Sequence, residues 1–286
     1  MNLTLFVLLI IVLLLIAIAI YDMHVIKVVT YQIQTNKISK NLKLVFLSDL
    51  HNQKFGKNND RLIKKIDRYQ PDYILIGGDM LTARPNKKNK EAIFLINQLS
   101  EKFQVYHALG NHEYRAKIYT ETYGNMYNEY ITSIKNAKMH ILDNQSLFLQ
   151  DENIRISGLS IDKMYYKRKN KSANAINELD ISKSLGDSDF HTYQILLAHN
   201  PDYFENYKKW NPDLILSGHF HGGIIRIPGV GGLISASLQF FPKYDGGIYR
   251  EKFGAFIISR GLGMHTIPIR IGNPCELVCI ELSKNE

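Results

Sequence analysis

Apolar residues follow two different patterns along the chain, and the first is a single long run. Leu3 to Ile20 is apolar throughout except for Thr4. As a helix rising about 1.5 Å per residue, this run would span roughly 27 Å, close to the roughly 30 Å hydrocarbon core of a bilayer. Residues 1–24 are therefore predicted to form a transmembrane helix, which places the protein at the cell membrane with a single pass.

The start of the chain also has one feature of a cleaved signal peptide. Ala17–Ala19 has the small-x-small form that signal peptidases accept, but no Lys or Arg precedes the apolar run, although signal peptides usually begin with positive charge. We therefore favour an uncleaved anchor, with cleavage as the alternative. Four lysines follow the run, and this positive charge favours a cytoplasmic location for the rest of the chain. They are Lys27, Lys37, Lys40 and Lys43.

The second pattern is a series of short apolar runs of strand length. Helical segments at Asp60–Tyr69 and Lys90–Leu99 separate the first of them, and this alternation is typical of an α/β sheet. We expect an anchor over 1–24, a linker and first strand over 25–42, and one domain over 43–286. The predicted strands are Thr30–Thr35, Lys43–Ser48, Tyr73–Ile76, Val105–Leu109, Gln194–Leu197, Leu214–Leu216 and Glu276–Leu282.

Side chains capable of binding metal follow five of these strands. Ligands of α/β sheets bind beyond the carboxyl ends of the strands, so we expect these side chains to meet at one edge. They are Asp49, His51, Asp79, Asn111, His199, His219 and His221. Two carboxylates, one carboxamide and four imidazoles can hold two divalent cations with a shared carboxylate, and imidazole suits Mn, Fe, Co or Zn better than Mg or Ca. Two cations about 3.5–4 Å apart can hold a hydroxide and stabilise phosphate oxygens, which predicts phosphoester hydrolysis.

Composition excludes some classes of protein but leaves several kinds of partner open. Hydrophobic residues make up 45% of the chain and charged residues 22%, which excludes a disordered or fibrous protein. The net charge of +8 admits phosphorylated ligands, nucleic acid or an anionic membrane as partners. Cys275 and Cys279 are the only cysteines, so neither a disulfide scaffold nor a cysteine zinc site can organise the fold. Both are predicted to be buried thiols.

The polar segments at the strand ends resemble the five motifs of the calcineurin-like metallophosphoesterases. The glycine-rich tail at Ser259–Gly263, followed by the last strand, is most similar to the bacterial membrane-associated subgroup. That subgroup includes exported cell-wall-associated phosphoesterases and enzymes that cleave the pyrophosphate of UDP-2,3-diacylglucosamine. The resemblance implies a four-layer αββα sandwich with a two-metal site at one edge. The motifs are Asp49-x-His51, Gly78-Asp79, Gly110-Asn111-His112-Glu113, His199 and Gly218-His219-x-His221.

The resemblance also implies how the ligands are shared between the metals. The first metal is assigned to Asp49, His51 and His221, the bridge to Asp79, and the second metal to Asn111, His199 and His219. The metals themselves are expected to be Mn, with Zn, Fe or Co as alternatives.

Catalytic and supporting roles follow from the same resemblance. His112, next to the ligand Asn111, is implied to stabilise the transition state or to protonate the leaving oxygen, a role that suits a group titrating near neutrality. Glu113 stands where many family members have Asp, and we assign it a role in orienting His112. In the tail loop, Arg260, His265 and Arg270 are candidates for contacting substrate phosphate, with a turn-stabilising role as the alternative.

Several conspicuous residues have a structural interpretation instead. His107 lies within an apolar strand and is predicted to be a core residue. Tyr119, Tyr123, Tyr127 and Tyr130 lie on one face of a predicted helix after the third motif, and we favour core packing over a pocket for an apolar substrate. The stretch 143–190 is the one long enough to hold an insertion of specialised shape. The basic segments 86–90 and 163–171 are interpreted as solvated loops, with attraction of lipid headgroups as the alternative.

Three functions remain open from the sequence. The first is a membrane-anchored phosphohydrolase that cleaves a phosphodiester or pyrophosphate bond by attack of a metal-bridging hydroxide, with lipid-linked molecules among its candidate substrates. The second is a nuclease, which the positive net charge favours and the predicted membrane anchor disfavours. The third is a non-catalytic binding module, which the complete ligand set and His112 argue against.

Overall fold

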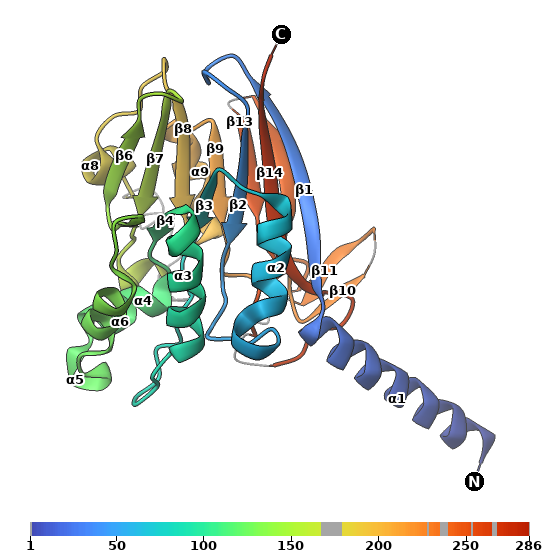
Figure 1. The fold of residues 1–286 in the computed structure, drawn as a ribbon. Coiled ribbons are helices and arrows are strands. Elements are labelled where there is room, and N and C mark those ends of the chain that lie inside the picture. The colour runs from blue at the N-terminus through green and yellow to red at the C-terminus, as the bar shows by residue number, and fades with distance from the viewer. Residues whose placement is uncertain are drawn as a thin grey trace.

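The core of the molecule is a pair of six-stranded sheets packed face to face (Figure 1). The computed structural model describes residues 2–166, 179–227, 229–234, 240–252, 254–264 and 268–285. The predicted His265 and the basic residues 167–171 lie outside these ranges.

The first sheet contains most of the strands predicted from the sequence. Its order is β1-β14-β2-β3-β4-β5, in which β2 to β5 run parallel, β14 is antiparallel to β2, and β1 is parallel to β14. β1 pairs with β14 along its whole length, so the segment after the anchor is built into this sheet. The bounds are β1 Ile26–Thr35, β14 Cys275–Lys284, β2 Leu42–Leu47, β3 Tyr73–Ile76, β4 Gln104–Ala108 and β5 Met139–Leu142.

The second sheet has the order β12-β13-β9-β8-β7-β6, with four parallel strands between two antiparallel edge strands. The bounds are β12 Gly247–Glu251, β13 Gly254–Ile258, β9 Leu214–Ser217, β8 Tyr193–Ala198, β7 Ile154–Leu159 and β6 Gln145–Leu149. The described part of the stretch 143–190, which is long enough to hold an insertion, contains β6 and β7 of this sheet. A hairpin of β10 (Ile225–Ile227) and β11 (Gly231–Ile234) stands apart from both sheets.

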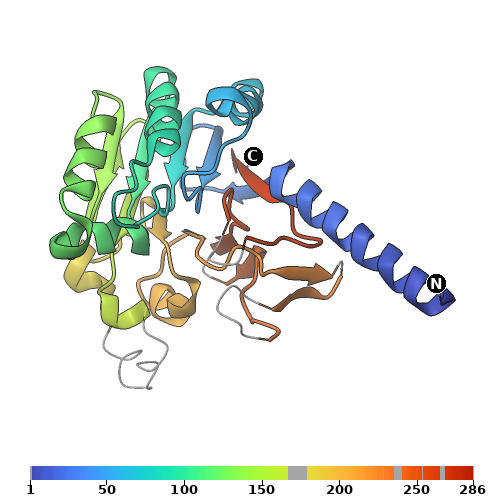
Figure 2. The ribbon, with the colours of Figure 1, turned by 90° about the horizontal axis from the view of Figure 1, so that it is seen from below.

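Helices cover the outer face of each sheet and complete the predicted αββα layers (Figure 2). The first sheet is covered by α2 (Asp60–Tyr69), α3 (Lys90–Lys102) and α6 (Met126–Ile134), and the second by α8 (Ile181–Leu185) and α9 (Phe204–Lys209). Shorter helical segments are η1 Lys57–Asn59, α4 Asn111–Ile118, α5 Thr120–Tyr123, η2 Lys163–Tyr166 and η4 Pro201–Tyr203.

Burial on both faces explains why a central strand such as β3 is an apolar run. In β3, Ile74 and Ile76 pack toward the helices of the first sheet, while Leu75 points into the core between the two sheets. Because successive strand residues face opposite sides, a strand with a core on each side has no solvent-facing position. Cys275 and Cys279 are free thiols buried in this way, as predicted.

The predicted tyrosine helix is divided into two pieces. Gly124, with a backbone φ of 59°, lies between α5 and α6, so the prediction of one continuous helix was wrong. The packing interpretation is confirmed for Tyr123, Tyr127 and Tyr130, which pack against the core under the first sheet.

The apolar N-terminal run forms α1 (Leu3–His24), which extends away from the domain with its apolar stretch exposed (Figure 1). It is long and apolar enough to cross a membrane, and a signal sequence passes the same test. Its last turn contacts the domain, where the Asp22 carboxylate is buried and accepts a hydrogen bond from the Asn273 N–H at 3.0 Å.

Candidate metal centre

The site lies where the loops after five parallel strands converge between the two sheets. Asp49, His51, Asp79, His219 and His221 all have a positive φ, between 46° and 72°. Such values are uncommon outside glycine and cost energy that the surrounding structure must offset. The strained turns bring side chains from both sheets to one point.

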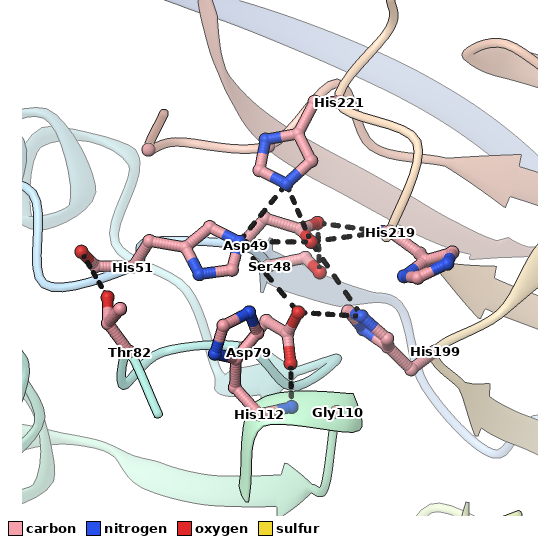
Figure 3. Close-up of polar contacts among 12 residues, drawn as sticks. Ser48, Asp49, His51, Asp79, Thr82, Gly110, His112, His199, His219 and His221 are labelled. Carbon is pink, nitrogen blue, oxygen red and sulfur yellow. Dashed lines mark hydrogen bonds and ion pairs between the residues drawn. The ribbon is translucent and has the colours of Figure 1, made fainter. Parts of the chain in front are cut away.

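One group of ligand atoms comes from Asp49, His51 and His221. The Nε2 atoms of His51 and His221 are 3.1 Å apart and lie 4.0 Å and 3.4 Å from Asp49 Oδ1 (Figure 3). This is the set that the resemblance assigned to the first metal.

A second group comes from Asp79, His199 and His219, and Asp79 lies between the two groups. Asp79 Oδ2 is 3.2 Å from His199 Nε2 and 3.8 Å from His51 Nε2. One carboxylate therefore reaches ligands of both groups, as a bridging ligand must.

Two buried polar atoms indicate that these residues suit metal ions. His199 Nδ1 donates to the Gly77 carbonyl at 2.8 Å, which directs Nε2 toward the carboxylates in the orientation that metal-ligating histidines adopt. Nε2 is buried and lies 3.2 Å from Asp79 Oδ2, and the buried Oδ1 atom of Asn111, the first residue of α4, has no hydrogen-bond partner within the described residues. Buried polar atoms normally have a partner, so Asn111 Oδ1 fits a site that takes a cation.

Charge in the site favours cations as well. Burial lowers the pKa of His199, but Asp79 and Asp49 outweigh this effect and raise it to about 10. Burial would raise the pKa of Asp79, yet the imidazoles around it hold that pKa well below its usual value. The two buried carboxylates therefore favour a positive charge beside them, either a proton or a metal ion.

Hydrogen bonds from a serine hydroxyl and from main-chain N–H groups hold both carboxylates in place. Asp49 accepts from the Ser48 hydroxyl at 2.7 Å and from the His219 N–H at 3.0 Å, which ties the first sheet to the second. Asp79 Oδ1 accepts from the His112 N–H at 2.7 Å, so the start of α4 holds the central carboxylate.

Glu113 supports the site differently from the predicted role. Its buried carboxylate accepts from the N–H groups of Asp79 at 2.7 Å, Leu81 at 3.1 Å and Gly110 at 3.0 Å. It thus holds the loop of Asp79 against the start of α4. The His112 ring is instead oriented by the Ala83 N–H, which donates to Nδ1 at 2.8 Å.

This hydrogen bond determines which nitrogen of His112 carries a proton. Because Nδ1 is the acceptor, the neutral ring has its proton on Nε2. Burial lowers the pKa of His112, so the neutral form predominates near pH 7. His112 lines a cleft of about 590 Å³ together with His51, and can therefore meet a molecule that enters it.

The cleft has a basic wall that sequence reasoning missed. Arg84, Lys87 and Arg115 line it together with His112. They come from the loop after β3 and from α4, and the sequence placed only Lys87 in a basic segment, interpreted as solvated. The position of Arg115 could have been predicted, because Arg115 follows His112 by one helical turn and so lies on the same side of α4.

The predicted substrate contact at Arg260 is not supported. The Arg260 guanidinium donates to Glu276 Oε1 at 2.8 Å and 3.0 Å, and Glu276 is buried. Arg270 is also buried and donates to the carbonyls of Arg260, Gly261 and Gly263. Both arginines hold the tail loop in place, which is the structural alternative.

Asn273 is a further supporting residue that the sequence did not indicate. Its side-chain amide donates to the His221 carbonyl at 2.7 Å and to the Gly223 carbonyl at 2.6 Å. Because its N–H bonds to Asp22, the end of α1 is connected to the loop of His221 through one residue. No local pattern predicts a contact between segments so distant in the chain.

The fold and the site agree with one protein family. A model of the calcineurin-like phosphoesterase family matches residues 42–223, well over half of the chain, and the chain belongs to this family. This match covers every residue of the two metal-ligand groups.

Individual relatives agree with this assignment. An uncharacterized metallophosphoesterase of Campylobacter jejuni is 29% identical over 90% of this chain, and this chain spans about 63% of its length. A transmembrane protein with a metallophosphoesterase domain from Bos taurus is 26% identical over 82% of this chain and 52% of its own. Among solved structures, Vacuolar Protein Sorting 29 from Cryptosporidium parvum matches with a TM-score of 0.41 and 9% identity, over 86% of this chain and 88% of that one.

Proposed function

We propose that the protein is a membrane-anchored, dinuclear-metal phosphohydrolase that cleaves a phosphodiester or pyrophosphate bond. The position of Asp79 between two groups of ligand atoms, with the His112 ring nearby at the cleft, carries this proposal. Two divalent cations bound there would activate a water molecule and offset charge on phosphate oxygens. The imidazole-rich ligand set suits Mn, Zn, Fe or Co better than Mg or Ca, and we propose Mn as the first of these metals to test.

The protein's own groups supply a hydrogen bond and its orientation. His112 carries its proton on Nε2 and lines the cleft, so its N–H is placed to donate a hydrogen bond to a phosphate oxygen or to the leaving oxygen as negative charge develops there. Its ring needs no reorientation, because the Ala83 N–H already fixes the tautomer.

The basic wall of the cleft favours substrates with more negative charge than one phosphate. Arg84, Lys87 and Arg115 surround the space beside His112. Guanidinium groups bind phosphate oxygens strongly, so a second phosphate of a pyrophosphate, or another anionic group, suits this wall.

Membrane attachment is part of the proposal. The exposed apolar α1 supports it, and the bovine relative is itself a transmembrane protein by name. Lys27, Lys37 and Lys40 support a cytoplasmic catalytic domain.

Turnover of bis(p-nitrophenyl) phosphate by the full chain in detergent micelles tests the activity. We expect hydrolysis after addition of Mn²⁺ and loss of hydrolysis on chelation. The Asp79→Ala variant is expected to have no measurable turnover, because both ligand groups lose their shared carboxylate. Absence of activity with each of Mn, Co, Zn and Fe would contradict the proposal, and digestion of DNA at a comparable rate would favour the nuclease.

A further inference from the structure

Large apolar side chains are exposed on the domain near the base of α1. Val230 is 64% exposed, Phe240 72% and Phe241 63%, and Ile227 and Ile269 are also exposed. We call these five residues the apolar rim. A soluble surface seldom exposes aromatic side chains in such a group without a partner.

The rim belongs to one continuous piece of structure. β10 pairs with β11, and Val230 lies in the turn between them. On one side, Phe240 bridges to Ile234 of β11, and on the other, Ile271 bridges to Ile225 of β10. Four neighbouring segments therefore carry the rim side by side.

This piece of structure is fixed next to the point where α1 leaves the domain. Lys27, three residues after α1, lines a cleft of about 430 Å³ together with Ile227 and Val230. Asn273 connects the two parts, because it bonds to Asp22 in the last turn of α1 and to the Gly223 carbonyl just before β10. Figures 1 and 2 both show the β10–β11 hairpin projecting on the side toward which α1 extends.

We propose that the apolar rim is a second membrane contact, which rests on the surface of the bilayer that α1 crosses. The partner is a phospholipid bilayer, because the rim is continuous with the base of a helix whose apolar stretch is exposed along its length. Apolar and aromatic side chains enter the interface of a bilayer, and the exposed Lys27 beside them suits anionic headgroups.

The contact places the proposed catalytic cleft at the level of the headgroups. Pro268 lines the cleft beside His112, and the next residue, Ile269, belongs to the rim. A lipid whose phosphate reaches the cleft could keep its apolar chains in the bilayer. This consequence rests on the proposed phosphohydrolase function, whereas the contact itself does not.

Quenching of tryptophan fluorescence by brominated lipid tests the contact in the full chain. The chain has one natural tryptophan, Trp210, which is buried and gives a constant background. Val230→Trp and Phe240→Trp are two independent reporters on the rim. Each is reconstituted in phosphatidylcholine–phosphatidylglycerol vesicles, with and without bromine on the acyl chains.

Two matched substitutions define the limits of the signal. Leu9→Trp, in the middle of α1, reports full insertion into the bilayer. Phe148→Trp reports a site away from the membrane, because Phe148 is exposed on β6, the edge strand of the second sheet at the end away from β12. We expect bromine to quench the added fluorescence of both rim variants, and to leave Phe148→Trp unchanged. If both rim variants behave like Phe148→Trp, the contact is overturned, whether Leu9→Trp is quenched or not.

The readout is independent of catalysis. Hydrolysis of bis(p-nitrophenyl) phosphate by the same preparations is measured in parallel. Quenching without hydrolysis would retain the membrane contact and reject the phosphohydrolase, and hydrolysis without quenching would do the reverse.

Discussion

His107 and His199 are both buried histidines near the carboxyl ends of parallel strands, one in each sheet. His107, in β4, bonds to neutral groups through both nitrogens: Nδ1 donates to the Ala108 carbonyl at 2.7 Å, and Nε2 accepts from the Tyr130 hydroxyl at 2.8 Å. His199, just after β8, bonds to a carbonyl through Nδ1 only, and its Nε2 faces Asp79 and Asp49.

The two environments have opposite effects on the pKa. Burial lowers the pKa of His107 to about 4, so this ring stays neutral and contributes packing and hydrogen bonds. For His199, the effect of burial is outweighed by the carboxylates, which favour a cation next to the ring. Burial of a histidine therefore does not indicate function, and the charge facing its second nitrogen distinguishes the two cases.

The largest expected difference lies between substitutions at these two positions. His199→Ala is expected to abolish measurable turnover, because it removes a ligand from the group that Asp79 joins. His107→Gln is expected to retain turnover and metal content. Hydrolysis of bis(p-nitrophenyl) phosphate, together with metal analysis of the purified chains, measures both; equal losses at the two positions would remove the distinction.

His112 shares one feature with each of these two histidines. Like His107 it has a pKa lowered by burial, but it lines the cleft. His112→Ala is expected to reduce kcat by about 10²–10³-fold, the usual cost of removing a hydrogen-bond donor that stabilises developing charge. The loss should be greater for an alkyl leaving group than for nitrophenolate, because more negative charge needs stabilisation on the oxygen of a poorer leaving group. An equal loss with both substrates, or loss of bound metal, would contradict this role.

Glu113 affects the site only through the main chain, and a smaller effect is expected. Glu113→Gln keeps the size of the side chain but replaces one acceptor oxygen with an N–H donor, which faces the N–H groups of Asp79, Leu81 or Gly110. Residues that support metal ligands are typically worth about 10–100-fold in metal affinity. We expect activity to require more Mn²⁺ and to recover at saturation. A Mn²⁺ titration of turnover measures this, and an unchanged midpoint would show that Glu113 does not position Asp79.

Much of the site could be predicted because its residues follow apolar strands directly. The end of a strand such as β3 is visible where Ile76 gives way to Gly77 and Gly78, and Asp79 comes next. The edge strand β6 was missed because its residues are largely exposed and its apolar run, Leu147–Leu149, is only three residues long. The basic wall, the Arg260–Glu276 pair and the bonds of Asn273 each join segments that are separate in the chain or depend on how loops fold. Local patterns contain no information on such contacts.

The smallest expected effect is on stability and not on activity. Its measurement tests whether the His107 ring stays neutral in the folded core. Its pKa is about 4 in the folded protein, against 6.5 as the ordinary value of histidine. Below pH 6.5 the unfolded chain therefore binds a proton that the folded chain does not accept until about pH 4. The stability that His107 confers is complete above pH 6.5 and is lost as the pH falls from 6.5 to 4, by about 3 kcal/mol in total.

His107→Gln isolates this contribution, because glutamine does not titrate in this range. Thermal unfolding of both chains in the same detergent, at pH 7 and at pH 4.5, gives the comparison. The wild-type chain is expected to lose more stability than the variant between these two values, since the other titrating groups, including the carboxylates of the metal centre, are common to both. Equal losses would mean that the His107 ring accepts a proton inside the folded core, and the contrast with His199 would then rest on hydrogen bonding and not on charge.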